Sequence, residues 1–391
     1  MLDVKQSSLV ILHLLSAQAE VLQSRDATSF VEVTGRFLRD CCRAQVSVAP
    51  KIFANLCHKF SQLCISEGHA MQAILPLRSA SDKLAATATC LSPVHADYLH
   101  CCIKAKCYTM GAHFMDQRSI FSVDPKKTGL TPPHLLRYFY YGGVVYVGTK
   151  RWKDALDSFC TVISTPANTL SALVVEAYKK MVLVSLILHG KLSPLPKYTS
   201  NAVSRQLRSY TKEYDALDKH FQAGNMEELR EAVCSGADVF TEDQNTGLVK
   251  QVVHALTKCK IMQLTHTYIT LSLEDIAVSV GLENSRLAEN YILRMVESGE
   301  ISAKIEDPPG TVHFEEDCNE VTPADMLARL EQDLGATVQL TERVRKLETQ
   351  LAVNPQYIQK VGVRSRCCRC TIFVFFLSLS LAFGILLVLA W

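Results

Sequence analysis

The sequence predicts a mainly α-helical protein: stacked helical hairpins, then a winged helix, a long helix and a terminal membrane-spanning helix. Three observations carry this prediction. Strand-like alternation is nearly absent from the first 200 residues. Residues 266–318 then hold a compact pattern of two short helices followed by a hairpin. Finally, residues 371–391 contain no charged side chain, and about 20 apolar residues are enough to span a bilayer.

The composition is typical of a chain with two or three domains. The chain has 391 residues and a net charge of +2, so its overall charge gives no argument for nucleic-acid binding. The 15 cysteines are scattered and no N-x-[ST] sequon is present. This pattern favours a reducing compartment with buried thiols.

The N-terminal stretch "SSLVILHLLSAQA" has two interpretations. Its short apolar run and small-residue end resemble a signal peptide. However, His13 interrupts the run, and Val10, Leu14, Ala17 and Val21 recur at helical spacing. That periodicity indicates one buried face, so an ordinary packed helix is favoured.

Residues 140–159 pose a choice between a phosphate-binding loop and a helix-packing unit. A phosphate loop places Lys directly after its second glycine, with a hydroxyl next. Here Gly148 is followed by Thr149 and then Lys150, so the order is swapped. The loop positions after Gly143 would also be bulky and apolar, which suits a buried face better than a backbone cradle.

The same stretch fits a tetratricopeptide (TPR)-like repeat, whose pattern is W-x2-L-G-x2-Y, then A-x3-F, then P. Phe139, Gly143 and Tyr146 fall on its first-helix positions, and Ala155 and Phe159 on its second-helix positions. We expect the two small residues to permit close approach and the aromatic rings to fill the groove. Further on, "EAYKKMVLVSLILHG" is apolar all round at its centre, which predicts a deeply buried helix closed by its glycine.

The region after residue 266 predicts a winged helix. Ser272 can cap a first helix in a capping box with Asp275, Ile276 and Val280 form its buried face, and Gly281 allows the turn. The expected stripe of the second helix and the alternating strand positions are Leu287, Tyr291, Met295, Ile301, Ala303, Ile305, Val312 and Phe314.

Winged helices often bind DNA, with the second helix in the major groove. That helix carries two basic and three acidic residues here, namely Arg286, Arg294, Glu283, Glu289 and Glu297. The wing carries further acidic residues on either side of its turn. Such a surface would repel phosphates, so a protein-docking module is favoured and no nucleic-acid partner is expected.

Residues 322–353 predict a long amphipathic helix. Its apolar stripe runs near coiled-coil spacing and comprises Leu327, Leu330, Leu334, Val338, Leu340, Val344, Leu347 and Leu351. Two roles stay open, an intramolecular brace on the winged helix and a strand of an intermolecular helical bundle.

The uncharged run 371–391 is preceded by Arg364, Arg366 and Arg369. Positively charged segments next to a membrane-spanning helix stay on the cytosolic side of the membrane. The pattern therefore predicts a tail anchor with a cytosolic body. The adjacent Cys367, Cys368 and Cys370 are candidates for palmitoylation.

Catalytic signatures are missing. The sequence contains no H-E-x-x-H, G-x-S-x-G or G-x-G-x-x-G motif. His95, His100 and Cys102 are the nearest approach to a cluster, and packed core roles are favoured over a metal site because ligand-pair spacing is absent. We expect no catalytic residues, cofactor or metal.

Helical repeats running into a winged helix and a terminal helix resemble the PCI family of scaffold subunits. The strings "YYGGVVYVG", "ISTPA", "EAYKKMVLVSLILHGKLSPLPKYTS", "TGLVKQ" and "LTHTYITLSLEDIA" are most similar to its COP9 signalosome members, over about Leu2 to Gln359. Scaffolds of the proteasome lid or of a translation initiation complex are the alternatives, together with a tail-anchored membrane adaptor.

The resemblance implies a non-catalytic scaffold in the cytoplasm and nucleus. The signalosome removes the ubiquitin-like protein NEDD8 from cullins, and its metalloprotease site lies on another subunit. The implied partners are the other signalosome subunits and, through the complex, cullin–RING ubiquitin ligases. The implied domains are helical repeats over 1–200, a PCI domain over 201–318 whose winged helix begins at 266, a bundle helix over 322–353 and the anchor over 371–391. The apolar terminus departs from the family, which ends in a polar tail.

Overall fold

The computed structural model describes residues 4–21, 27–85, 87, 89–118, 120, 123–166, 170–196, 199–306, 310–315, 323–355 and 357–359. The chain forms two compact units, residues 1–315 and 316–391. The predicted anchor 371–391 and its candidate palmitoylation sites Cys367, Cys368 and Cys370 lie outside the described residues. Among the residues that the structure does describe, no helix combines the length and apolarity needed to cross a bilayer.

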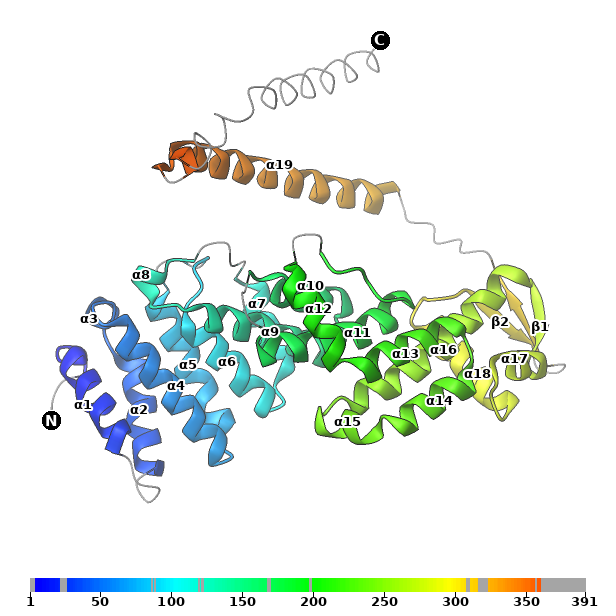
Figure 1. Cartoon of the computed structure of the whole chain (residues 1–391), viewed down its shortest axis with the longest axis horizontal. Helices are drawn as coiled ribbons and strands as arrows, with labels where there is room; N and C mark the ends of the chain where they lie inside the picture. Colours follow the sequence, from blue (N-terminus) through cyan, green and yellow to red (C-terminus); the bar gives the residue numbers. More distant parts are fainter. Residues whose placement is uncertain are drawn as a thin grey trace, which may run out of the picture. The chain divides into compact units, whose positions relative to one another are not determined.

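The larger unit begins with consecutive helices, most of which pack on helices one to three positions away in the chain, such as α1 on α4, α2 on α5 and α9 on α10 (Figure 1). They are α1 (Ser8–Val21), α2 (Ala27–Asp40), α3 (Arg43–Val46), α4 (Pro50–Ser66), α5 (Ala70–Leu84), α6 (Pro93–Lys104), α7 (Tyr108–Asp116), α8 (Pro125–Thr128), α9 (Pro132–Gly148), α10 (Trp152–Ser164) and α11 (Ala172–His189). The helix-rich expectation for this half is therefore confirmed.

Helix α11 shows how local sequence sets an element. Its centre is buried on all sides, from Met181 to Leu186. Gly190 then ends the helix in the left-handed conformation, with φ of 65°, as its position in the sequence predicted.

The predicted buried face of α1 is wrong. Val10, Leu14 and Val21 are exposed, whereas Leu12 and Leu15 enter the core. Because α1 is apolar on more than one side, periodicity alone did not identify the side that α3 and α4 cover.

Five further helices continue the same unit: α12 (Asn201–Tyr210), α13 (Lys212–Ala223), α14 (Met226–Ser235), α15 (Ala237–Glu242) and α16 (Thr246–Thr267). One core cluster runs from Leu12 through Leu186 and Val203 to Leu256. The core thus continues through residue 200, and the domain bounds drawn from the sequence stay predictions.

A winged-helix arrangement follows, with β1 (Thr270–Ser272), α17 (Leu273–Val280), α18 (Ser285–Glu297), β2 (Ala303–Glu306) and β3 (Thr311–Phe314). The sheet has the order β1-β3-β2 and is antiparallel. Its core is a separate cluster that includes Ile261, Ile276, Val280 and Val312. The sequence reasoning found the hairpin but missed β1, a strand of three residues that is too short for an alternation signal.

Two local predictions in this region are confirmed and one is wrong. The Ser272 hydroxyl accepts a hydrogen bond from the Asp275 amide, and Gly281 ends α17 with φ of 80°. In α18, however, Leu287 is 41% exposed, and the buried residues are Ala288, Ile292 and Met295. Of the predicted stripe, Met295 is therefore buried and Tyr291 is partly buried against the same core, whereas Leu287 faces away and Ala288 is buried beside it.

The second unit contains α19 (Pro323–Val353), a helix of 31 residues. The sequence predicted this helix over 322–353. Residue 322 lies outside the described residues, and the predicted last residue is also the last residue of α19.

Candidate docking surfaces

The predicted repeat-packing residues lie along α9 and α10. A Cβ atom on Gly143 would lie 2.6 Å from Cε1 of Phe159, so a glycine is needed for the two helices to pack this closely. Ala155 and Phe159 are fully buried, Tyr146 is buried and Phe139 is partly buried against the core. The structure thus brings Gly143 and Phe159 into direct opposition.

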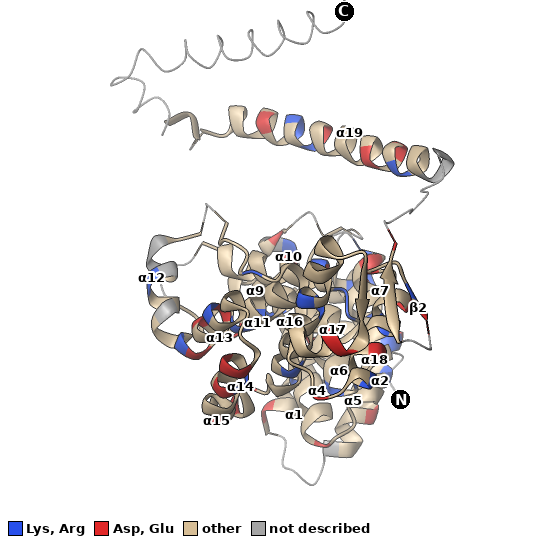
Figure 2. Ribbon diagram, turned by 90° about the vertical axis from the view of Figure 1, so that its right-hand side faces the viewer, with Lys and Arg blue, Asp and Glu red and all other residues tan. Residues whose placement is uncertain are grey.

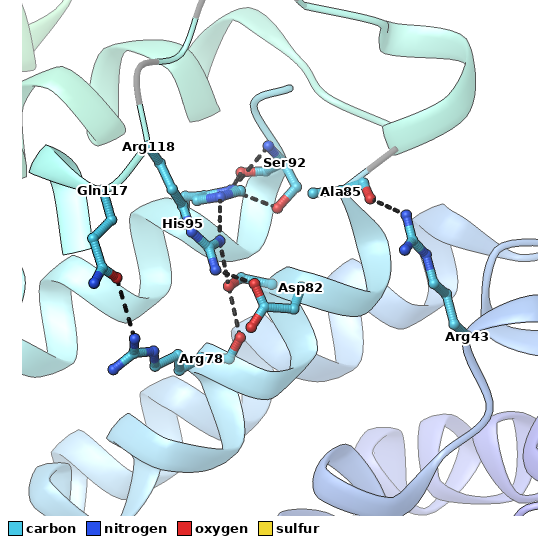
Figure 3. Close-up of polar contacts among 9 residues, drawn as sticks. Arg43, Arg78, Asp82, Ala85, Ser92, His95, Gln117 and Arg118 are labelled. Atoms are coloured by element: carbon cyan, nitrogen blue, oxygen red, sulfur yellow. Dashed lines mark hydrogen bonds and ion pairs between the residues drawn. The ribbon is translucent and has the colours of Figure 1, made fainter. Parts of the chain in front are cut away.

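A polar cluster around the buried His95 connects α5, α6 and the segment after α7 (Figure 3). His95 Nδ1 lies 2.6 Å from Ser92 Oγ, and His95 Nε2 lies 3.3 Å from a guanidinium nitrogen of Arg118. Arg118 also pairs with Asp82 and lies 4.4 Å above the ring centroid of Phe114. Burial lowers the pKa of His95 to about 4, so its imidazole is neutral at physiological pH.

The histidines considered together in the sequence have separate packing roles. His95 faces Ser92 and Arg118, while His100 stacks on Tyr141 with ring centroids 4.7 Å apart. Burial raises the pKa of the Cys102 thiol to about 11, which disfavours the thiolate that metal binding requires. In the part of the chain that the structure describes, no group of three or more His, Cys, Asp or Glu could hold a metal ion.

The winged helix presents an acidic outer surface. Residues 268–315 contain nine Asp and Glu but only three Lys and Arg. Figure 2 shows acidic residues on α17, whose first turn carries Glu274 and Asp275. Exposed apolar residues lie among them, notably Ile269 and Val278, the second of which is 82% exposed. This mixture suits a protein partner better than a phosphate backbone.

The α19 unit carries an exposed apolar stripe. All eight predicted stripe residues are between 49% and 64% exposed: Leu327, Leu330, Leu334, Val338, Leu340, Val344, Leu347 and Leu351. Exposed apolar side chains at this spacing are typical of a helix that packs in a bundle. The role of the stripe stays a prediction.

Comparison with known protein families matches two ranges of the larger unit. Residues 1–203 match a family model described as COP9 signalosome complex subunit 3, N-terminal helical repeats, and residues 226–316 match the PCI domain. The chain belongs to the COP9 signalosome subunit 3 family. A COP9 signalosome complex subunit 3 from Dictyostelium discoideum is 32% identical, over 92% of this chain and 86% of its own length. One from Arabidopsis thaliana is 33% identical, over 92% of this chain and 83% of its own length.

Membership of the COP9 signalosome subunit 3 family confirms the resemblance found in the sequence, along with the helical repeats and the PCI domain. The PCI match ends at residue 316, two residues after β3 ends. The α19 stripe lies beyond both matched ranges, so its role does not follow from them.

Sequence reasoning missed a repeated helix start within the signalosome repeats. Both α6 and α9 begin with the pattern [ST]-P-x-H, in which the histidine side chain accepts from the backbone amide of the cap. The pairs are Ser92 with His95 and Thr131 with His134. A search for capping boxes that included His at the third helical position would have found them.

Proposed function

We propose that this chain is a non-catalytic scaffold of the COP9 signalosome in the cytoplasm and nucleus. It contributes surfaces that hold other signalosome subunits, and the removal of NEDD8 from cullins takes place on a different subunit. Its link to cullin–RING ubiquitin ligases is therefore indirect, through the assembled complex.

The match of residues 1–203 to signalosome-specific repeats carries this proposal, because it distinguishes the signalosome from other assemblies that use PCI domains. The docking surfaces agree with it. The winged helix exposes acidic and apolar side chains, and α19 exposes apolar side chains along its length, from Leu327 to Leu351. We propose that α19 enters a helical bundle formed with other subunits, and that the winged helix docks against a neighbouring PCI domain.

Affinity purification of the tagged chain, followed by mass spectrometry, tests the assignment. The expected result is recovery of the other signalosome subunits in fixed ratio. Recovery of proteasome-lid or translation-initiation subunits instead would reassign the chain to another PCI complex. The purified chain alone is expected to leave a NEDD8–cullin conjugate intact, whereas the recovered complex cleaves it.

We propose a membrane-anchored form as a second role, supported by the uncharged sequence 371–391 and the arginines before it. The test compares the full chain with a variant that lacks these residues. We expect the full chain to stay with membranes during carbonate extraction and the truncated variant to be released. If carbonate also released the full chain from membranes, the proposed membrane anchor would be refuted, and the signalosome assignment would be unaffected.

A further inference from the structure

The last repeat helix, α11, packs directly against α13 and α16. These helices lie side by side in Figure 1. Helix α11 belongs to the range matched by the signalosome repeats, and α16 to the range matched by the PCI domain. This contact therefore joins the two matched parts of the chain.

A nearly buried ion pair lies at this joint. Lys179 Nζ of α11 is 2.7 Å from Asp243 Oδ1, at the end of α15, and 3.0 Å from Glu176 Oε1. The side chains of Lys179 and Asp243 are only 12% and 13% exposed. The two residues are 64 positions apart in the sequence, so the pair forms only when the two parts of the chain are docked.

A tyrosine and an asparagine complete the network. The Tyr214 hydroxyl of α13 donates to Asp243 Oδ2 over 2.7 Å, and Asn245 Nδ2 donates to the Tyr214 hydroxyl over 2.8 Å. Tyr214 and Asn245 are buried, and the Lys179 ammonium lies 5.9 Å from the Tyr214 ring centroid. Burial raises the pKa of Tyr214, so its hydroxyl keeps the proton that it donates.

The directional contacts at the joint restrict how α11 can sit against the PCI helices. Apolar surfaces tolerate small rotations and sliding, because dispersion and hydrophobic contacts have little directional preference. A buried ammonium and carboxylate do not, because moving either one leaves an unpaired charge away from water. In some proteins, buried polar networks of this kind select one arrangement at little gain in stability.

We propose that Lys179, Asp243, Tyr214 and Asn245 form an orientation lock that fixes the signalosome repeats against the PCI helices. The lock goes beyond the scaffold assignment and does not depend on which complex the chain enters. Its consequence is that the winged helix is presented to neighbouring subunits at one angle to the repeat helices.

The first test removes one hydroxyl. Tyr214→Phe deletes the group that connects Asp243 and Asn245, and Tyr210→Phe is the matched control because Tyr210 is exposed on the preceding helix. In the full-length chain, we expect Tyr214→Phe to increase tryptic cleavage after the exposed Lys191, in the connector between α11 and α12, at least about fivefold. Tyr210→Phe is expected to cleave as slowly as the unmodified chain, and equal cleavage of both variants contradicts the lock.

The second test separates orientation from stability. Lys179→Met removes the cation that pairs with the nearly buried Asp243 carboxylate, which keeps its hydrogen bond from Tyr214, and should lower the unfolding temperature by about 5 °C or more. Adding Asp243→Leu replaces the pair with apolar side chains and should restore part of that loss, because the buried charge is gone although the Tyr214 hydroxyl loses its acceptor. The double variant is nevertheless expected to stay susceptible at Lys191. If trypsin cleaved the double variant after Lys191 as slowly as it cleaves the unmodified chain, packing alone would set the orientation and the proposal would be overturned.

Discussion

At position 143 the space for a side chain is already occupied. A methyl group there would lie 2.6 Å from the Phe159 ring, so Gly143→Ala must displace that ring or move α9 away from α10. We expect the free energy of unfolding to fall by about 1–3 kcal/mol, measured by chemical denaturation. Gly247→Ala, in α16, is the control because nothing lies within 4 Å of its added Cβ. A Gly143→Ala chain as stable as that control would contradict the close packing.

The buried His95 predicts a loss of stability in mild acid. Burial lowers its pKa from 6.5 to about 4, so the unfolded chain takes up this proton first as the pH falls. The stability that neutral His95 contributes is present above pH 6.5 and is lost between pH 6.5 and about 4. Between pH 7 and pH 5 this loss is about 2 kcal/mol.

His95→Gln isolates that contribution. Glutamine keeps an acceptor for the Ser92 amide in the capping box but cannot take up the proton. Denaturant unfolding at pH 7 and pH 5 should therefore show a smaller loss in the variant than in the unmodified chain. Equal losses would show that other groups cause the acid sensitivity.

Single residues with local roles were predictable from the sequence. The cap at Ser272 and the helix-ending glycines at 190 and 281 act within one or two helical turns, and the structure confirms all three. The packing of His95 was favoured only in outline, because Arg118, which contacts it from beyond the end of α7, is itself held by Asp82 of α5.

The stripe of α19 leads to a prediction at the level of an element. Leu347→Asp places a charge in the proposed bundle seam, whereas Glu348→Lys changes the adjacent position outside it. We expect Leu347→Asp to reduce recovery of partner subunits at least tenfold, because an unpaired charge in a packed seam costs about 3 kcal/mol or more. Glu348→Lys should assemble normally. Co-purification of each variant provides the measurement, and equal assembly by both would contradict a buried stripe.

Helix bounds were easier to predict than helix faces. The sequence placed the end of the bundle helix at residue 353, and α19 ends at Val353. The buried side of α1 was assigned wrongly, and that of α18 was wrong at Leu287 although Met295 is buried as predicted. Each helix has apolar residues on two neighbouring sides, and the side that is buried depends on which distant elements pack there.

The charge of the winged helix predicts the behaviour of the whole molecule toward nucleic acid. Three basic residues against nine acidic ones over residues 268–315 leave little to offset phosphate repulsion. The full-length chain should show no binding to labelled duplex DNA by fluorescence anisotropy at about 150 mM salt. Binding that weakens steeply as salt rises would establish a nucleic-acid function instead.

The sequence alone determined the helical character, the main caps, the winged-helix region and the family, because each depends on residues close together in the chain or on long matching strings. Only the tertiary structure decided which face of α1 and α18 is buried, that β1 pairs with β3, and that Lys179 meets Asp243. Those features join residues that lie far apart along the chain. Helical periodicity repeats every 3.6 residues and contains no information about which distant surface will cover a given side.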